Sequence, residues 1–424
     1  MLVKFLKSCR GGVAPMMGLL AVPLIGFVGV AVDYTRASAA RTAFQATLDA
    51  TALMLSKNSA AQSSTDLQAT VNNTFNAIFT RPDVSNVAIT ANYTSNSGSQ
   101  LVLNGTAIVS TNFLGVLGYG QIGIAASATS TWGNNRLRLA LVLDNTGSMA
   151  SSGKMTALQT AAQNLLSQLK SAAVNDGDVY VSIIPFNKDV NVGSDKNAAT
   201  WLRWDLWEEV NGSCSSGSYS TQSACTSHSK TWTPASHATW NGCVTDRDQN
   251  FDTTNDAPVA GATLYPAEQY SSCPASLMAL SYDWTALSAK INAMQPNGNT
   301  NQAIGLQLGW QSLTASPFTV PPMDPNYKYN QAIILLTDGL NTQDRWYGSQ
   351  SLIDARQQKT CDNVKAAGIT IYTVQVNTGN DPTSTLLQNC ASDPSKFFLL
   401  TSSTEIVTTF NQIGTALSNL RLSM

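Results

Sequence analysis

The longest uninterrupted run of apolar positions lies near the start of the chain. Residues 11–32 contain no charged side chain, and as a helix rising about 1.5 Å per residue this run matches the roughly 30 Å apolar core of a bilayer. Basic residues precede it at positions 4, 7 and 10, and Asp33 follows it. By the positive-inside rule, we expect a single transmembrane helix with residues 1–10 in the cytoplasm and the remainder of the chain outside.

Two processed forms of this segment compete with a retained anchor. A cleaved signal peptide normally has an apolar region of about 7–15 residues, which is shorter than this run, although Ala37, Ser38 and Ala39 form a small-residue pattern that could be cleaved. A prepilin-type start would be cleaved near Gly11 or Gly12, but the acidic residue usual soon afterwards is missing, since positions 16 and 17 are both Met. We therefore favour a retained anchor.

A helical pattern continues beyond the apolar run. Residues 33–57 are rich in Ala, and apolar side chains recur at spacings of three or four, which predicts a helical stalk. These positions are Phe44, Leu48, Ala52 and Leu55. Such a stripe could pack on a partner helix or on the stalk's own domain.

Residues 58–135 change to shorter patterns. A helix is expected within 60–79, and later segments alternate apolar and polar positions as strands do. These strands are expected at 87–95, 100–110 and 122–132, with a short helix at 111–118. We interpret the region as a small α+β module without a catalytic constellation.

From residue 136 to residue 424, short apolar runs alternate with stretches of helical periodicity. The strands are expected at 139–144, 178–186, 332–337, 368–376 and 396–400, and the helices at 154–172, 284–294, 302–310 and 402–420. Strands that alternate with helices imply right-handed βαβ crossovers. We predict an α/β fold with a doubly wound, mainly parallel sheet.

Composition narrows the class of protein. Charged residues make up only 12% of the chain, about half of the usual ~25%, and Ser, Thr, Asn and Gln supply the polar surface instead, as in many exported proteins. The net charge is −2 and no long basic run is present. Nucleic-acid binding needs clustered Lys and Arg to neutralise phosphates, so we do not expect a nucleic-acid partner.

Cysteine positions agree with an exported location. Cys9 precedes the apolar run, and an even number follow it, at positions 214, 225, 243, 273, 361 and 390. An even set in an oxidising compartment predicts disulfides. Proximity in sequence favours pairing Cys361 with Cys390 and forming two bridges among Cys214, Cys225, Cys243 and Cys273; the alternative is a set of buried free thiols.

Oxygen-bearing side chains gather where three predicted segments end. Asp144, Thr146 and Ser148 follow the strand at 139–144, Thr300 lies on a loop that leads into a helix, and Asp338 follows the strand at 332–337. In open α/β sheets, ligands bind at the carboxyl ends of the strands. Hard cations such as Mg²⁺ prefer oxygen ligands, so we expect a divalent metal here.

These segments resemble the metal-ion-dependent adhesion site (MIDAS) of von Willebrand factor A (VWA) domains. The resemblance implies that Asp144, Thr146, Ser148, Thr300 and Asp338 surround a divalent metal, directly or through water. Mg²⁺ is favoured, with Mn²⁺ and Ca²⁺ as alternatives. It also implies that a partner's carboxylate completes the coordination. Thr146 stands where Ser is commoner and keeps the hydroxyl.

The pattern of the VWA-like region is interrupted at residues 192–282. This insertion holds four of the cysteines and much Ser, Thr, Gly and Asn, so disulfides would be needed to stabilise it. Cys214, Cys225, His228, His237 and Cys243 could instead hold zinc, but their spacings match no familiar finger. Its five tryptophans, Trp201, Trp204, Trp207, Trp232 and Trp240, could form a binding surface or, as we favour, a miniature core.

The N-terminal segment resembles that of TadG-like proteins of the tight-adherence (Tad or Flp) pilus-assembly systems of bacteria. The resemblance lies in a Gly-rich entry, a Pro-containing apolar run, the pair Asp33-Tyr34, and the phrase LDATAL at 48–53. A phrase like TWNGCVTDRD (239–248) within a Cys-bearing insertion is also typical of the group. The resemblance implies an inner-membrane protein that projects into the periplasm.

The expected function is that of a non-enzymatic factor for pilus assembly or adhesion, which binds a protein partner through the metal. One alternative is a purely structural anchor whose metal site only stabilises the fold. A metal-dependent hydrolase is the remaining alternative. It is disfavoured because His228 and His237 both lie in the insertion and no Gly-x-Ser-x-Gly motif is present.

Overall fold

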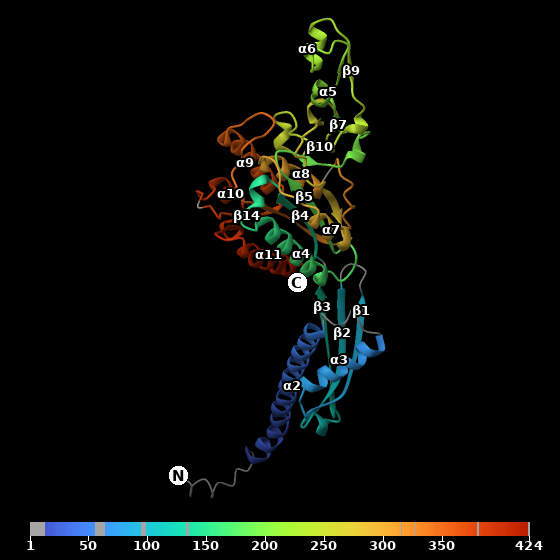
Figure 1. Ribbon diagram of the computed structural model, residues 1–424. Coiled ribbons are helices and arrows are strands. Elements are labelled where there is room, and N and C mark those ends of the chain that lie inside the picture. Colours follow the sequence, from blue (N-terminus) through green and yellow to red (C-terminus); the bar gives the residue numbers. More distant parts are fainter. Residues whose placement is uncertain are drawn as a thin grey trace. The chain divides into compact units, whose positions relative to one another are not determined.

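The chain forms two compact units that divide between Asn134 and Asn135 (Figure 1). We describe each unit by itself. The computed structural model describes residues 13–55, 64–94, 99–132, 135–314, 316–325, 327–379 and 381–422. The expected cytoplasmic segment 1–10, with Cys9, lies outside these residues.

The N-terminal unit begins with one long helix, α2 (Val13–Leu55), which contains Pro23. The expected membrane segment and stalk are therefore parts of a single element. The helix from Met16 to Leu55 is long and apolar enough to cross a membrane. Most of its apolar side chains before Asp33 are exposed, whereas those of the later stripe are buried. This difference separates the exposed apolar part of the helix from the part that packs within the unit.

A three-stranded antiparallel sheet in the order β1-β2-β3 completes this unit. Its elements are α3 (Ser64–Ile78), β1 (Val84–Thr94), β2 (Ser99–Ser110), the 3-10 helix η2 (Leu114–Leu117) and β3 (Gln121–Trp132). The stripe of α2 packs on this sheet: Phe44 and Leu48 are fully buried in one core with Phe75 and Leu103. The stripe is thus covered by its own unit.

The C-terminal unit contains a mixed sheet in the order β15-β14-β13-β4-β5, continued by shorter strands. The main strands are β4 (Asn135–Asp144), β5 (Val179–Phe186), β13 (Lys328–Thr337), β14 (Thr370–Val376) and β15 (Phe397–Leu400). All pairings among these five are parallel. The predicted α/β class with a mainly parallel sheet is therefore confirmed.

Helices cover both faces of this sheet. They are α4 (Lys154–Ala172), α7 (Trp284–Asn292), α8 (Gln302–Thr314), α9 (Gln350–Ala366), α10 (Thr385–Cys390) and α11 (Thr404–Leu422). Alternate residues of β4 face opposite layers: Leu141 packs in the core formed with α4, α7 and α11, and Val142 packs in the core formed with α8, α9 and α10. This alternation follows the two-residue period of a strand and explains why β4 is apolar throughout.

The insertion is not simply a loop, because it continues the sheet beyond β5. β6 (Val190–Asn191) pairs antiparallel with β5 and with β10 (Cys243–Val244), and β11 (Tyr265–Glu268) follows. β7 (Leu202–Arg203) adds to β11 in parallel, and β12 (Met278–Ser281) pairs with β5. The described part of the C-terminal unit also contains short 3-10 helices. They are η3 (Gly147–Ala150), η4 (Ser194–Lys196), η5 (His237–Thr239), η6 (Phe251–Thr253), η7 (Gly261–Thr263) and η8 (Pro394–Lys396).

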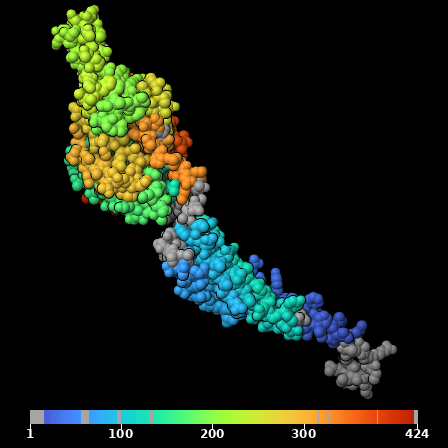
Figure 2. Space-filling view, turned by 90° about the vertical axis from the view of Figure 1, so that its right-hand side faces the viewer, coloured from blue at the N-terminus to red at the C-terminus, as the bar shows by residue number. Residues whose placement is uncertain are grey.

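Part of the insertion, residues 205–240, forms an arm that projects from the body of this unit (Figures 1 and 2). It contains α5 (Asp205–Val210), β8 (Gly212–Cys214), α6 (Gln222–Ser227) and β9 (Trp232–Pro234). At its base, Trp207 and Trp240 are buried, and Trp204 stacks on His237 with ring centroids 3.7 Å apart. Trp207 and Trp240 are buried, as the sequence favours, but they belong to the core on the α8 side of the sheet and not to a separate miniature core.

Three disulfides hold the C-terminal unit. Cys214 bonds to Cys225 within the arm, and Cys243 bonds to Cys273 across the insertion. The third joins Cys361 of α9 to Cys390 of α10, the pair that proximity in sequence favours. The alternative of a zinc site made from Cys214, Cys225 and Cys243 with the two histidines is wrong, because all three sulfurs are in disulfides.

Candidate metal centre

The first site residue lies where the central strand β4 ends. Asp144 is completely buried, because β4 is covered on both faces up to its last residue. One oxygen, Oδ1, accepts a hydrogen bond from the backbone N–H of Thr146 at 2.8 Å. The other, Oδ2, accepts one from the hydroxyl of Thr337, the last residue of β13, at 2.6 Å. The parallel pairing of β4 with β13 brings these two strand ends together.

Hydroxyl groups connect this aspartate's loop to the second carboxylate. The hydroxyls of Thr146 and Ser148 are 3.0 Å apart, and the Ser148 hydroxyl donates to Oδ1 of Asp338 at 2.6 Å. Thr146 and Asp338 are buried, whereas Ser148 is exposed. The cluster therefore leads from the end of the sheet to the surface, where a partner could reach it.

The loop that carries Thr300 docks on both of the other loops. Gly147 donates its N–H to the carbonyl of Gly298 at 3.0 Å. Thr300 receives a hydrogen bond at its carbonyl from the N–H of Thr342, and its own N–H donates to the Thr342 hydroxyl at 2.8 Å. Thr300 is thus held beside the cluster by its backbone. Among the described contacts, its hydroxyl forms no bond to the other four predicted residues.

The electrostatics of the cluster favour a cation. Burial, and after it the neighbouring charge of Asp338, raise the pKa of Asp144, while hydrogen bonds from Thr146 and Thr337 lower it; the net result is a pKa of about 7. Two buried carboxylates and nearby hydroxyls are hard oxygen donors of the kind that Mg²⁺ and Ca²⁺ take. Within the residues that the structure describes, no group of three or more His, Cys, Asp or Glu could hold a metal. A metal here would therefore depend on the hydroxyls.

Two further residues of the cluster were not predicted from the sequence. Thr337 donates its hydroxyl to Asp144. Lys154 forms a buried ion pair with Oδ2 of Asp338. The Lys154 ammonium comes from the first residue of α4 and partly neutralises the two carboxylates. Thr337 has a sequence signal, since it directly precedes Asp338, but Lys154 has none beyond its place at the start of a helix.

A second group of buried carboxylates lies on the insertion side of the Thr300 loop. Oδ2 of Asp246 accepts hydrogen bonds from the side-chain amide of Asn301 at 2.8 Å and from the N–H of Arg345 at 3.1 Å. Burial, and after it the charge of Asp344, raise the pKa of Asp246 to about 7 against the opposing effect of these hydrogen bonds. Both of these bonds to Asp246 come from N–H groups, which cannot bind a cation, whereas Asp144 receives an N–H bond and a hydroxyl bond.

Comparison with known families matches two separate parts of the chain. Residues 11–67 match the model described as putative Flp pilus-assembly TadE/G-like, and residues 266–412 match the von Willebrand factor type A domain. The chain joins a TadE/G-like segment to a VWA domain. The VWA match begins near the end of the insertion, so Thr300 and Asp338 lie within it and Asp144 precedes it.

Several solved structures resemble the chain at low identity. The pilus adhesin SpaC from Lactobacillus rhamnosus GG is 14% identical, with 80% of this chain and 35% of that chain covered and a TM-score of 0.39. The vWF domain of the type V pili tip protein Mfa5 from Porphyromonas gingivalis is 10% identical, with 68% and 97% covered and a TM-score of 0.39. Proximal thread matrix protein 1 from the mussel byssus, with a zinc-occupied MIDAS motif, is 13% identical, with 68% and 47% covered and a TM-score of 0.35.

The chain thus spans about a third of the length of the SpaC chain that it matches. A comparison with curated proteins gives no match.

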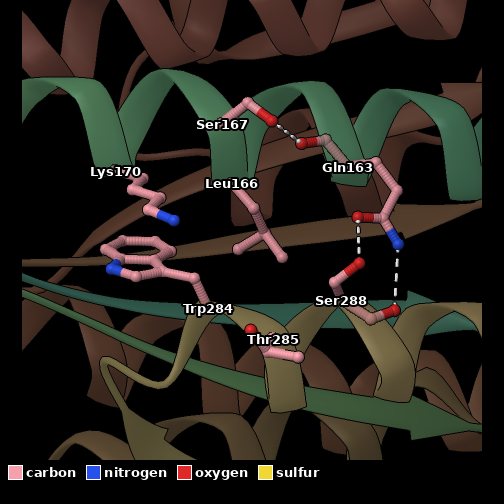
Figure 3. A pocket seen from close by; sticks show the side chains of 7 residues that line it. All are labelled: Gln163, Leu166, Ser167, Lys170, Trp284, Thr285 and Ser288. Carbon is pink, nitrogen blue, oxygen red and sulfur yellow. Dashed lines mark hydrogen bonds between the residues drawn. The ribbon is translucent and has the colours of Figure 1, made fainter.

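A groove on the VWA domain lies between α4 and α7 (Figure 3) and measures about 300 Å³. Its lining includes Trp284, Leu166 and Lys170. Gln163 of α4 accepts a hydrogen bond from the Ser288 hydroxyl at 2.7 Å and donates one to the Ser288 carbonyl at 2.9 Å. The groove shares no residue with the metal cluster, and these bonds serve to join the two helices.

Proposed function

We propose that this protein is a membrane-anchored, non-enzymatic factor for pilus assembly or surface adhesion. Its TadE/G-like segment supplies the anchor, and its VWA domain binds a protein partner through a divalent cation, with Mg²⁺ favoured. The residues that would hold the cation are Asp144, Thr146, Ser148, Thr300 and Asp338. The inner membrane, with the VWA domain in the periplasm, is the proposed location.

One observation carries the metal part of the proposal: two carboxylates from different strand ends meet in a single cluster with hydroxyl groups. Asp144 is buried beside Asp338, and its pKa is raised to about 7 by that burial and by the second charge. A bound divalent cation would offset this repulsion and offer a coordination position to a carboxylate of the partner. The exposed Ser148 lies at the solvent side, where such a group would approach.

Hydrogen bonds within the protein hold the proposed metal ligands in position before a metal binds. The Thr146 N–H and the Thr337 hydroxyl hold the carboxylate of Asp144 in one orientation. The Ser148 hydroxyl holds Asp338. Because these groups belong to rigid strand ends and docked loops, little conformational entropy would be lost when a ligand binds.

The first experiment measures metal binding by the full chain in detergent micelles. We expect Mg²⁺ and Mn²⁺ titrations by calorimetry to show saturable binding that an Asp144→Ala variant loses. Asp176→Ala, which changes an exposed aspartate of the same unit, serves as the control and should bind like the natural protein. Equal binding by the Asp144 and Asp176 variants would contradict the proposed site.

The second experiment measures partner capture from bacterial surface proteins, with and without a chelator. Metal-dependent capture that Asp144→Ala loses, while this variant stays folded, would support a metal bridge. Capture that continues unchanged in the variant would overturn that bridge.

A purely structural role for the site is the second candidate, and the Lys154 ion pair favours it. Because this ammonium already pairs with Asp338, the cluster is partly neutralised by the protein itself. If the site only stabilises the fold, chelation should lower the melting temperature and leave capture intact.

Hydrolysis has little support from the described residues. Both histidines have packing partners in the arm: His237 stacks on Trp204 and bonds to Glu208, and His228 stacks on Tyr219. A His228→Ala/His237→Ala variant that lost a measured hydrolytic activity would revive the alternative.

A further inference from the structure

The connection between β2 and β3 in the N-terminal unit packs against α2 at the end of its apolar run. Asp33 of α2 accepts hydrogen bonds from three consecutive backbone N–H groups of this connection. They come from Asn112 at 3.0 Å, Phe113 at 2.7 Å and Leu114 at 2.7 Å. Residues 111–120, which we call the β2–β3 loop, are therefore fixed to the helix at a defined height.

Gly29 places part of this loop beside the membrane-spanning part of the helix. A Cβ atom at Gly29 would lie 2.6 Å from the Cβ of Phe113, so only a glycine permits this approach. Gly29 is inside the uncharged run 11–32. Its neighbours Val28 and Ile25 are 58% and 64% exposed in the isolated chain. If those side chains lie in lipid, Phe113 lies at the same level.

The loop has the surface expected of a segment in contact with lipid. Residues 110–121 contain no charged side chain, and three large side chains of the loop are exposed: Val116 is 86% exposed, Tyr119 71% and Phe113 45%. Tyrosine is a residue that membrane–water interfaces favour. An apolar surface of this kind, continuous with an exposed apolar helix, is poorly suited to water.

The backbone of the loop is also largely satisfied by internal hydrogen bonds, as a low-water environment requires. Besides the three bonds to Asp33, Val116 donates to the carbonyl of Phe113 and Tyr119 donates to that of Leu114. Thr111 bonds through its hydroxyl to the carbonyl of Tyr119 at 2.6 Å. Gly118, with φ of 91°, provides the left-handed turn that closes η2.

Charged groups begin one to two turns further along α2. Arg36 lies 3.8 Å from Asp83, which also pairs with Arg81. At about 1.5 Å of rise per residue, Arg36 is roughly 10 Å beyond Gly29. This change from apolar to charged surface has the dimensions of the boundary between lipid tails and headgroups.

We propose that the β2–β3 loop is a second membrane contact, which inserts Phe113, Val116 and Tyr119 into the interface of the leaflet from which α2 emerges. The occupant of this apolar surface is the lipid bilayer, because the surface continues that of the anchor helix. The proposal depends on α2 spanning the membrane and is independent of the metal site. Contact at two points would stop the unit from tilting on its anchor.

Spin labels in the full chain, reconstituted into vesicles of phosphatidylethanolamine and phosphatidylglycerol, test the proposal. In a Cys9→Ser background, Val116→Cys carries the label, Val28→Cys is the lipid reference and Asn92→Cys, exposed near the far end of β1, is the aqueous reference. We expect the ratio of oxygen to nickel-chelate collisions at position 116 to be several-fold above that at position 92 and to approach that at position 28.

A matched pair of helix variants tests the role of Gly29. Gly29→Leu should push Phe113 and the loop away from α2 and return the label at position 116 to the aqueous ratio. Gly26→Leu makes the same change where nothing lies within 4 Å of an added Cβ and should leave the ratio unchanged.

Three results would overturn the proposal. One is an aqueous ratio at position 116 beside a lipid ratio at position 28, which would leave the anchor intact without the second contact. Another is protection from both reagents, which would indicate a protein partner on the loop. The third is an aqueous ratio at position 28 itself, which would remove the anchor as well; the metal titrations remain separate from all three.

Discussion

Asp33 and Asp144 both end long apolar segments, yet their surroundings differ. Asp33 follows the uncharged run of α2 and accepts three backbone N–H bonds from one loop. Asp144 ends β4, and there a single N–H is accompanied by hydroxyls and by a second carboxylate, Asp338. The three N–H donors satisfy the carboxylate of Asp33, which therefore has a structural role. The carboxylate of Asp144 receives only one N–H bond and lies beside the negative charge of Asp338, which is why we propose a metal there.

The comparison shows that an aspartate after an apolar run can have either role. What distinguishes the two is whether the approaching groups only donate hydrogen bonds or can themselves donate electron pairs to a cation. Backbone N–H groups cannot bind a cation, whereas hydroxyl and carboxylate oxygens can.

The largest difference is expected in metal affinity. Asp338→Ala should abolish saturable Mn²⁺ binding, a loss of more than ~100-fold, since even residues that only orient metal ligands contribute 10–100-fold. Asp33→Ala should leave the affinity unchanged. Electron paramagnetic resonance of free Mn²⁺ in titrations of the full chain measures both. Similar losses in the two variants would mean that the two aspartates do not differ as proposed.

Asp246 is a buried aspartate outside the proposed metal cluster, so its replacement tests the effect of burial alone on stability. Its pKa is raised to about 7, above the ~3.9 of an unfolded chain, so the folded state holds the proton more tightly and stability falls as the pH rises from about 4 to 7. Asp246→Asn removes this loss and keeps one oxygen for both hydrogen bonds to Oδ2. Between pH 4 and pH 7, the free energy of unfolding of the variant, measured with urea, should increase relative to that of the natural protein by at most about 4 kcal/mol.

The control for this measurement is Asp176→Asn, at an exposed position. If the difference in the free energy of unfolding between Asp246→Asn and the natural protein does not change with pH, the raised pKa of Asp246 does not determine how this residue affects stability.

At Asp33, the expected effect is local. Asp33→Ala removes the acceptor for three N–H groups, so amide hydrogen exchange of residues 112–114 should speed up by at least ~tenfold, the equivalent of one hydrogen bond to a charged group. Exchange in β4 should not change. Mass spectrometry of peptides from the β2–β3 loop measures this. Unchanged exchange would show that the loop is held by other contacts.

The smallest effect is expected at Lys154. Lys154→Met removes the ammonium that competes for Asp338, so divalent affinity should rise by roughly 3- to 10-fold, while the melting temperature without metal should fall. Lys170→Met, on the exposed face of the same helix, is the control. A fall in affinity would mean that Lys154 supports the site rather than competing with it.

The sequence predicts the main architecture well, because periodicity over long segments is a strong signal. β4 and β13 contain continuous apolar runs, β4 ends at Asp144, and Asp338 directly follows β13. The helix α9 was not predicted, and neither were the short strands β6 to β12, because strands of two to four residues have no measurable alternation. Their pairing depends on tertiary contacts that a single sequence does not display.

The candidate site divides in the same way. Its five proposed ligands come from a motif, so they could be named from sequence. The ion pair of Lys154 with Asp338 joins residues far apart in the chain, and only the fold reveals it. The packing of Phe113 on Gly29 was missed for the same reason, because either residue alone is unremarkable in its segment.

The position of β4 has a mechanical consequence. This strand receives the chain directly from the N-terminal unit at its first residue, Asn135, and ends at Asp144. Tension applied between Asn135 and a ligand held at Asp144 would load β4 along its own length. Its parallel neighbours β5 and β13 are in register along almost the whole strand, so their hydrogen bonds would bear the tension in shear and would have to break together. The strand would therefore resist a pull applied between Asn135 and Asp144.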